Sequence, residues 1–241
     1  SMANKARALV MGLTGSLFAP APAGAAPETR RYYRHLTRFS SAFAFVADVS
    51  MLVLGGSLKR REKLSARLGD VLSQLYLASC VLKRYEEDGR RQEDLPFVHW
   101  ALRDALAKIQ SAFDGVFANY PGALLGWGLK RVIFPLGMHF APPSDTLGHE
   151  ITRVLIQPSA QRDRLTAGMY VPKSVSEPLG TLEAALEATI KSEAIEMKIR
   201  TAQRAGTIQG NSPAARAEAA HAAGVVSAEE LAHYTRTALL R

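Results

Sequence analysis

The sequence predicts an all-α protein, an antiparallel helical bundle of six or seven helices. Apolar residues recur at alternating steps of four and three along most of the chain, which is the spacing that places side chains on one face of an α-helix. Nothing between these stretches alternates apolar and polar residues with a period of two, so we expect no sheet. The connections between the longest stretches are short, and short connections make consecutive helices antiparallel neighbours.

The N-terminal residues predict a short helix and then a linker. We interpret Ser1-Met2 as the remnant of an expression tag and residues 3–18 as the tail of an upstream domain. Residues 19–30 are rich in proline and alanine, and proline at this density stiffens the backbone and interrupts helices. The sequence therefore predicts a domain boundary at this linker, with a helical-bundle domain over residues 31–200.

Three long helices dominate that domain. The first is apolar on nearly every side and should be central, and Gly55-Gly56 ends it because glycine adopts the left-handed cap conformation without steric cost. Ser57 is predicted to cap the second helix. The residues expected to face the core are, in the first helix, Tyr32, Leu36, Phe39, Phe43, Val46, Ser50 and Val53; in the second, Leu64, Leu68, Val71, Leu75, Ala78, Leu82 and Tyr85; and in the third, Val98, Leu102, Ala105, Ile109, Ala112 and Val116.

The chain beyond the third helix is less regular. Residues 124–140 are apolar and interrupted by glycines, with a basic pair in the middle. Further helices are predicted over residues 144–157 and 181–201, and Ser227 and Glu230 form a capping-box pattern that starts a last helix. We expect residues 201–241 to form an Ala-rich helical tail.

The composition restricts the class of protein. The 241 residues are 47% hydrophobic and 22% charged, which is too apolar for a chain that is mainly disordered. The single cysteine, Cys80, excludes a disulfide framework, fits a reducing compartment, and is expected to be buried as a small apolar group. Residues 39–56 approach the length of a membrane span but contain Asp48 and three serines, so we interpret them as part of a core helix.

The positive charge is concentrated near the N-terminus. Residues 1–67 hold eleven lysines and arginines against three acidic residues, whereas the remainder is balanced. No nucleic-acid recognition motif accompanies this excess, so we expect no nucleic-acid partner. The excess favours attraction to acidic phosphates, to anionic lipids or to an acidic protein.

No motif predicts an active site or a metal centre. The six histidines lack zinc-protease spacing and cysteine partners, so no metal is expected. No glycine-rich loop follows a strand, and no serine or cysteine has the setting of a nucleophile. Asp48 and Asp70 lie inside apolar helices, and we interpret them as buried structural carboxylates that bond to a neighbouring helix rather than as acid–base groups.

Four segments are specific enough to indicate a family, namely residues 48–76, 94–96, 134–137 and 141–145. Together they resemble the C-terminal extension of the large bacterial fatty acyl-CoA dehydrogenases of the FadE type. The resemblance runs from about Asn4 to about Ile199 and thins in the Ala-rich tail. It implies an all-α helical domain that follows the flavin-binding core of the parent enzyme.

The resemblance implies an activity for the parent enzyme and none for this chain alone. The parent would commit long-chain acyl-CoA to β-oxidation, with a glutamate taking the α-proton while FAD accepts the β-hydride. Since the flavin and acyl-CoA sites would lie upstream, we expect no cofactor and no catalytic residue in this chain. The implied partners are the upstream dehydrogenase core and further copies of the parent in a homo-oligomer, in the cytoplasm or peripheral to the inner membrane.

Residues 124–140 have two interpretations. As a membrane-binding hairpin, they would insert apolar side chains while the basic pair meets lipid phosphates. The preferred interpretation is that they pack on the dehydrogenase core. The side chains concerned are Leu124, Leu125, Trp127, Lys130, Arg131, Ile133, Phe134 and Phe140.

Other roles remain open for the bundle as a whole. It would act as a scaffold that stabilises and assembles the parent, or its basic first helices would hold the phosphate-rich end of CoA. The rival class is an independent helical interaction module, or a peripheral membrane-binding module, without any dehydrogenase partner.

Overall fold

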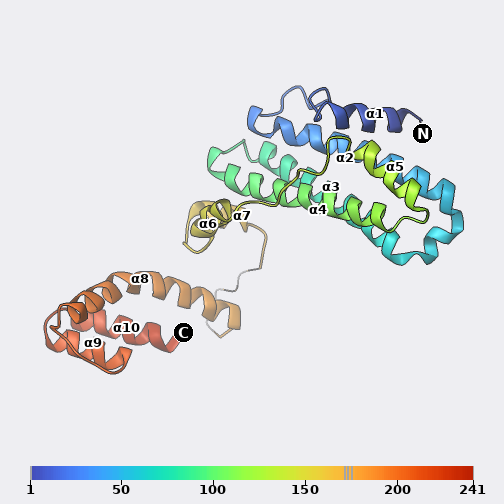
Figure 1. Ribbon diagram of the computed structural model, residues 1–241. Helices are drawn as coiled ribbons and strands as arrows, with labels where there is room; N and C mark the ends of the chain where they lie inside the picture. Colours follow the sequence, from blue (N-terminus) through green and yellow to red (C-terminus); the bar gives the residue numbers. More distant parts are fainter. Residues whose placement is uncertain (1, 171, 173, 175, 241) are drawn as a thin grey trace. The chain divides into compact units, whose positions relative to one another are not determined.

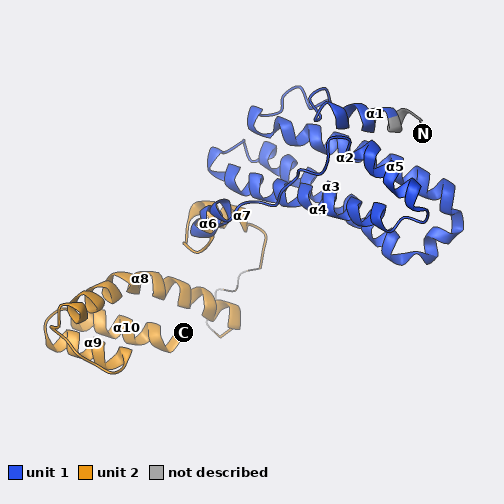
Figure 2. Ribbon diagram, in the orientation of Figure 1, with its two compact units in different colours: residues 1–153 blue, residues 154–241 orange. Residues whose placement is uncertain are grey.

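The computed structural model describes residues 2–170, 172, 174 and 176–240. The all-α prediction is confirmed, because these residues form ten α-helices, two short 3₁₀-helices and no strand (Figure 1). The number of α-helices is larger than the predicted six or seven, mainly because α7 (Ala160–Leu165) and α9 (Pro213–Ala222) are too short to show an apolar period in the sequence. The chain divides into two compact units, residues 1–153 and 154–241 (Figure 2).

Unit 1 is built around three long helices. Helix α3 packs along α4 and against α2, while α1 packs on α2 and α5, and α5 packs on α4. One apolar core joins all five helices. Their bounds are α1 Met2–Leu13, α2 Pro27–Leu54, α3 Glu62–Glu87, α4 Leu95–Ala118 and α5 Ala123–Ile133, with 3₁₀-helices η1 at Gly55–Arg60 and η2 at Gln92–Asp94; α6, Asp145–Leu155, crosses the boundary between the units.

The predicted inner face of α3 is confirmed at every position. All seven residues expected to face the core are buried, from Leu64 to Tyr85. In α4 five of the six predicted positions are buried, and Ala112 packs partly buried against the core. A four-three spacing sustained over six turns leaves no doubt about which face of a helix is apolar.

Helix α2 differs from its prediction at its C-terminal end. Phe39 and Val46 are fully buried, but Val53, expected in the core, is 51% exposed, and Leu52 is 86% exposed. Gly55 ends the helix in the left-handed region, with φ of 47°. The predicted cap at Ser57 is wrong, because its hydroxyl donates to the Leu54 carbonyl at 2.6 Å, and α3 begins after Arg61 instead.

One stretch, Pro27–Arg60, has the length and apolar composition of a membrane span. A core helix satisfies the same test, and α2 buries its Phe39 and Val46 face inside unit 1. The prediction that this stretch is a core helix therefore holds for the part of α2 that contacts the bundle.

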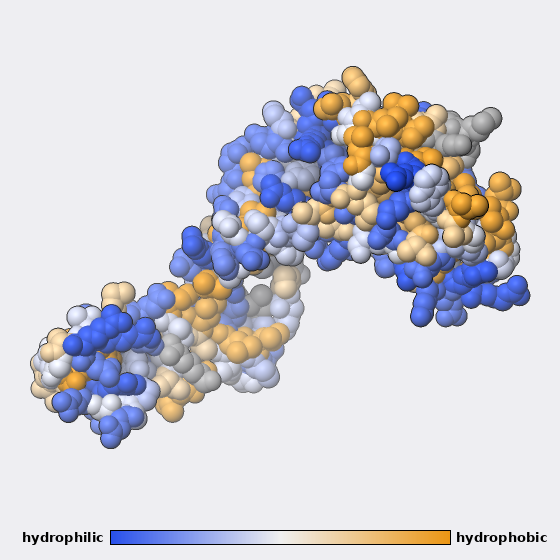
Figure 3. All heavy atoms as spheres, viewed as in Figure 1, coloured by the Kyte–Doolittle hydropathy of each residue, from blue (hydrophilic) through white to orange (hydrophobic). Residues whose placement is uncertain are grey.

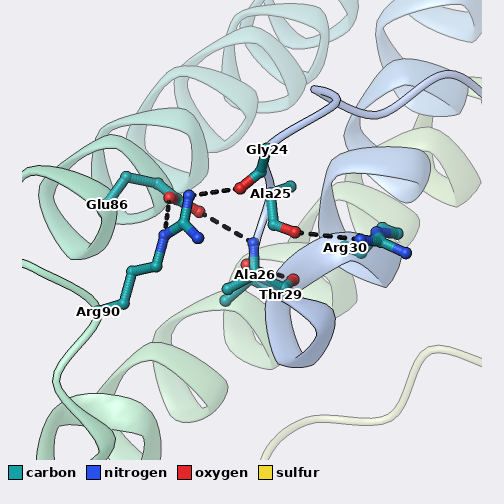
Figure 4. Close-up of polar contacts among 7 residues, drawn as sticks. All are labelled: Gly24, Ala25, Ala26, Thr29, Arg30, Glu86 and Arg90. Atoms are coloured by element: carbon teal, nitrogen blue, oxygen red, sulfur yellow. Dashed lines mark hydrogen bonds and ion pairs between the residues drawn. The ribbon is translucent and has the colours of Figure 1, made fainter.

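The proline- and alanine-rich segment before α2 is tied to the end of α3 (Figure 4). Glu86 accepts a hydrogen bond from the Ala26 amide at 3.5 Å and pairs with Arg90 at 2.6 Å. Arg90 also donates to the Gly24 carbonyl, and Ala25 and Ala26 are buried at 5% and 3% exposure. This segment therefore connects α1 to α2 within unit 1.

Unit 2 has a small core of its own. Helix α8 (Pro178–Arg204) packs against α9 and against α10 (Ala228–Leu240). The predicted capping box is confirmed, because the Ser227 amide donates to Glu230 at 2.9 Å and the Glu230 amide donates to the Ser227 hydroxyl at 3.1 Å. The buried apolar residues are Ile195, Ile199, Ala202, Ile208, Ala217, Ala220 and Val226.

The boundary between the two compact units lies between residues 153 and 154. The composition of the sequence predicts domain boundaries at other places, after residues 18, 30 and 200. The structure packs α8, most of which falls inside the predicted domain 31–200, with the helices of the predicted tail 201–241. Composition marks proline-rich and alanine-rich stretches, but it does not register where packing contacts stop.

Candidate functional site

The side chains of residues 124–140 separate into an inner and an outer group. Ile133 and Phe134 are buried at 1% and 2% exposure, and Leu125 and Phe140 pack partly buried against the same core. Leu124 and Trp127 point outward, with 87% and 62% of their surface exposed. Half of the predicted site thus belongs to the core of unit 1, and only the remainder is available to a partner.

Gly126 determines which face of α5 turns inward. A Cβ atom at this position would lie 2.3 Å from the Phe117 carbonyl oxygen and 3.1 Å from the Tyr120 Cβ. Only glycine allows α5 to lie this close to the end of α4. Because Gly126 faces α4, its neighbours Leu124 and Trp127 are directed to the surface.

The basic pair of the segment is engaged within the chain. Lys130 Nζ pairs with Asp114 Oδ1 of α4 at 2.7 Å. The Arg131 guanidinium lies 5.8 Å from the centre of the Trp127 ring, which is within cation–π range. Lys130 therefore helps to hold α5 on α4, whereas Arg131 stays at the surface with Trp127.

Helix α1 extends the exposed apolar surface of α5. A Cβ at Gly12 would lie 2.9 Å from Pro135 Cδ, so α1 closely approaches the end of α5. Hydrophobic side chains gather over α1 and α5 in Figure 3. We call the exposed apolar residues of α1, of α5 and of the segments that directly follow them the α1–α5 face: Val10, Leu13, Leu17, Phe18, Leu124, Trp127 and Leu136, each more than half exposed.

The two carboxylates predicted to be buried, Asp48 and Asp70, are both exposed, so that prediction is wrong. Asp48 lies two residues from both Val46 and Ser50, and on a helix this offset puts it on the opposite side from the buried face. Met51, Leu52 and Val53, which follow it in sequence, face solvent as well. Asp94 is the acid that the described part of the chain does bury, at 5% exposure.

Arg38 is a buried charge that the sequence analysis missed. It is 1% exposed, and its Nη2 donates to the Ile133 carbonyl at 2.8 Å. Its guanidinium carbon lies 5.2, 5.8 and 6.0 Å from the ring centres of Phe39, Phe134 and Phe140. Burial lowers its pKa to about 10. Arg38 is four residues before buried Ala42 and so lies on the inner face of α2, but Ala42 is not among the predicted core positions and the sequence did not mark this face.

His35 lies one turn before Arg38 and is 3% exposed. It accepts a hydrogen bond from Arg31 Nε at 3.2 Å, and its ring meets Phe140 edge-on at 5.0 Å. Burial, together with the charges of Arg31 and Arg38, lowers its pKa to about 4. His35 is therefore a neutral imidazole at neutral pH.

The described side chains differ from the sequence predictions in the placement of Cys80. Within the described residues, no group of three or more histidine, cysteine or acidic side chains is placed to hold a metal ion. Cys80, expected to be buried, is exposed on α3, because its register does not match the buried positions Ala78 and Leu82. The feature that stands out among the described residues is therefore the exposed apolar surface over α1 and α5.

A family model described as acyl-CoA dehydrogenase, C-terminal, bacterial type, matches the chain over residues 1–241. The match includes residues 200–241, where the resemblance seen in the sequence thins. No solved structure matches the chain.

Proposed function

Because the chain belongs to the bacterial-type acyl-CoA dehydrogenase C-terminal family, we propose that it is the helical domain that docks on the flavin-binding core of a FadE-type long-chain fatty acyl-CoA dehydrogenase. The full enzyme performs α,β-dehydrogenation of acyl-CoA in the cytoplasm, and this domain stabilises and assembles it. The domain contributes a surface and no reacting group.

FAD, which the family implies for the full enzyme, does not fit the residues described in this chain. A groove of about 530 Å³ on unit 1 carries two carboxylates, Glu86 and Glu87, against one lysine, Lys83, and the negative charge of the carboxylates would repel a pyrophosphate. The described residues include no strand followed by a glycine-rich turn. We therefore assign the flavin to the upstream core and derive no step of the oxidation here.

The α1–α5 face is the observation that carries this proposal. Exposed apolar patches of this kind are typical of protein interfaces, because a monomer gains nothing by presenting them to water. Trp127 beside Arg131 combines the two residue types most enriched among residues that dominate binding energy. The inner half of the segment is packed, so the outer half is presented on a rigid support.

The experiment compares full-length enzyme carrying Leu124→Ser and Trp127→Ser with enzyme carrying Leu239→Ser. Leu239 is 84% exposed, much like Leu124, but lies in unit 2. We expect the α5 variant to lose flavin at a lower temperature and to dissociate in size-exclusion chromatography, while the Leu239 variant behaves as wild type. Unchanged flavin retention and assembly in the α5 variant would refute docking through this face.

A second candidate function is peripheral binding to an anionic membrane, favoured by the end of α2. Met51, Leu52 and Val53 are exposed, and Lys59, Arg60 and Arg61 follow within and directly after η1. Apolar bulk beside basic residues is the pattern that binds anionic lipid surfaces.

Co-sedimentation with vesicles of phosphatidylglycerol tests this second role. Leu52→Ser should reduce sedimentation if the end of α2 inserts, whereas Trp127→Ser should reduce it if the α5 segment inserts. Equal sedimentation of wild type with neutral and anionic vesicles would remove the electrostatic argument.

A further inference from the structure

A cavity of about 360 Å³ lies in unit 1 between α2, α4 and the segment that follows α5. This volume is within the range of small-ligand sites. Four aromatic rings and two arginines line it, together with one carboxylate. The lining residues used in the argument are Arg31, Tyr32, His35, Arg103, His139 and Phe140.

Hydrogen bonds hold the walls of this cavity in place. Gln110 of α4 donates to the Phe140 carbonyl and accepts from the Phe140 amide, both at 3.0 Å. This reciprocal pair fastens the segment after α5 across the bundle. On the α2 side, the Tyr32 hydroxyl bonds His99 Nδ1 at 2.9 Å. The cavity is therefore a built feature whose rings are already positioned.

The charge in and behind the cavity is predominantly positive. The Nε of Arg31 donates a hydrogen bond to His35, and the other guanidinium nitrogens of Arg31 have no acceptor among the described residues. Arg103 is exposed and makes no hydrogen bond or ion pair within the same set. Glu28 is the one carboxylate in the lining, so the two arginines are not neutralised.

Arg38 adds a third positive charge behind the wall. It contacts the Phe140 ring, whose edge also meets His35. Its Nε and Nη1 atoms are buried and find no acceptor within the part of the chain that the structure describes. Buried charges are normally paired, so a buried arginine with two unused donors marks a region that favours an anion.

We propose that this cavity binds the phosphate group of a small organic phosphate. Arg31 and Arg103 would donate paired hydrogen bonds to the phosphate oxygens, which is the geometry that guanidinium groups favour. Tyr32 and His139, whose ring stacks on Phe140 with the centroids 4.6 Å apart, line the cavity and would contact the organic part. The proposal concerns a site away from the α1–α5 face and stands whether or not that face docks on a dehydrogenase core.

Calorimetric titration of the protein with AMP, adenosine and inorganic phosphate tests the proposal. We expect AMP to bind, and adenosine, which lacks the phosphate, to bind at least about tenfold more weakly. Arg103→Gln should weaken AMP binding by about tenfold. Because Arg103 is exposed and makes no hydrogen bond or ion pair among the described residues, this variant should fold normally.

Arg60→Gln with Arg61→Gln provides the matched control. These residues line a separate basic cavity of about 420 Å³, so they report adventitious attraction of AMP to a cationic surface. AMP binding should be unchanged in this variant. Adenosine binding as tightly as AMP, loss of AMP binding in the control rather than in Arg103→Gln, or no binding of AMP at millimolar concentration would each overturn the proposal.

Discussion

The Nη2 atom of Arg38 donates a hydrogen bond to the Ile133 carbonyl at 2.8 Å and so joins the middle of α2 to the last turn of α5. The last four carbonyls of a helix have no partner within it and carry the negative end of its dipole. A buried cation at this point satisfies one of them. This bond satisfies one of the guanidinium's nitrogens, whereas Nε and Nη1 have no acceptor among the described residues.

Arg38→Ala should lower the free energy of unfolding of unit 1 by about 2–4 kcal/mol, because it leaves the Ile133 carbonyl unpaired and opens a cavity among three phenylalanines. Urea titration followed by tryptophan fluorescence measures this change, since Trp100 and Trp127 both belong to unit 1. Exposed Arg91→Ala is the control and should shift stability by less than about 0.5 kcal/mol. Equal stability of the two variants would show that the buried guanidinium contributes nothing.

Replacement of two glycines of α5 by alanine should change the stability of unit 1 in opposite directions. Gly126→Ala places a Cβ 2.3 Å from the Phe117 carbonyl oxygen and should destabilise unit 1 by about 2–3 kcal/mol, because α5 must move away from α4. Gly128→Ala meets nothing within 4 Å and should stabilise the helix by about 0.5–1 kcal/mol. Thermal melts of both variants give the comparison, and destabilisation by Gly128→Ala would contradict the packing of α5 described above.

His35 should make unit 1 less stable in mild acid. Burial lowers its pKa from 6.5 to about 4, so the unfolded chain takes up a proton between these values while the folded chain does not. The stability is therefore complete above pH 6.5 and is lost as the pH falls toward 4. The loss attributable to His35 should be on the order of 2 kcal/mol.

Urea midpoints at pH 7, 6 and 5 measure this effect in wild type, His35→Gln and His149→Gln. We expect the pH dependence to be reduced in His35→Gln, because the residue that titrates is gone. His149 is exposed, so its variant should follow wild type. The same slope in all three proteins would assign the acid sensitivity to other groups.

In unit 2, the hydroxyls of Ser192 and Thr237 lie 2.9 Å apart between α8 and α10, and both residues are buried. Thr237→Val alone should cost about 1–2 kcal/mol, because the buried Ser192 hydroxyl loses its partner. Ser192→Ala should cost less, because the Thr237 hydroxyl still donates to the His233 carbonyl at 2.9 Å. The double variant should cost less than the sum of the two. Far-UV circular dichroism during urea unfolding provides the three values, and strict additivity would mean that the hydroxyls do not interact.

Much of the fold follows from periodicity, and the clearest case is α3. Its seven inner positions were predicted without error because each repeats the same four-three spacing. The end of α2 shows the limit of this reasoning. Its residues are equally apolar, yet Leu52 is exposed because it lies two residues from buried Ser50 and therefore on the side of the helix that no neighbour covers. Apolar composition says that a side chain can be buried, but only a neighbour can bury it.

The candidate site was predicted as a segment and not as a surface. The sequence singled out residues 124–140 by their apolar character, but it did not separate Trp127, which faces outward, from Phe134, which lies in the core. Gly126 decides which side chains face outward, because its close approach to the Phe117 carbonyl on α4 sets which face of α5 turns inward. The prediction for Asp48 was wrong for a related reason, since its apolar neighbours in sequence are not its neighbours in space.

The sequence by itself determined the helical class, the inner faces of α3 and α4 and the capping of α10, because these depend on interactions among residues within a few turns of one another. Only the tertiary structure decided that Arg38 is buried against Ile133 and that Leu124 and Trp127 face outward. These properties depend on which helix covers which: Arg38 meets a residue 95 positions away, and α5 turns its Gly126 side to α4. Contacts between different helices leave no periodic signal along the chain.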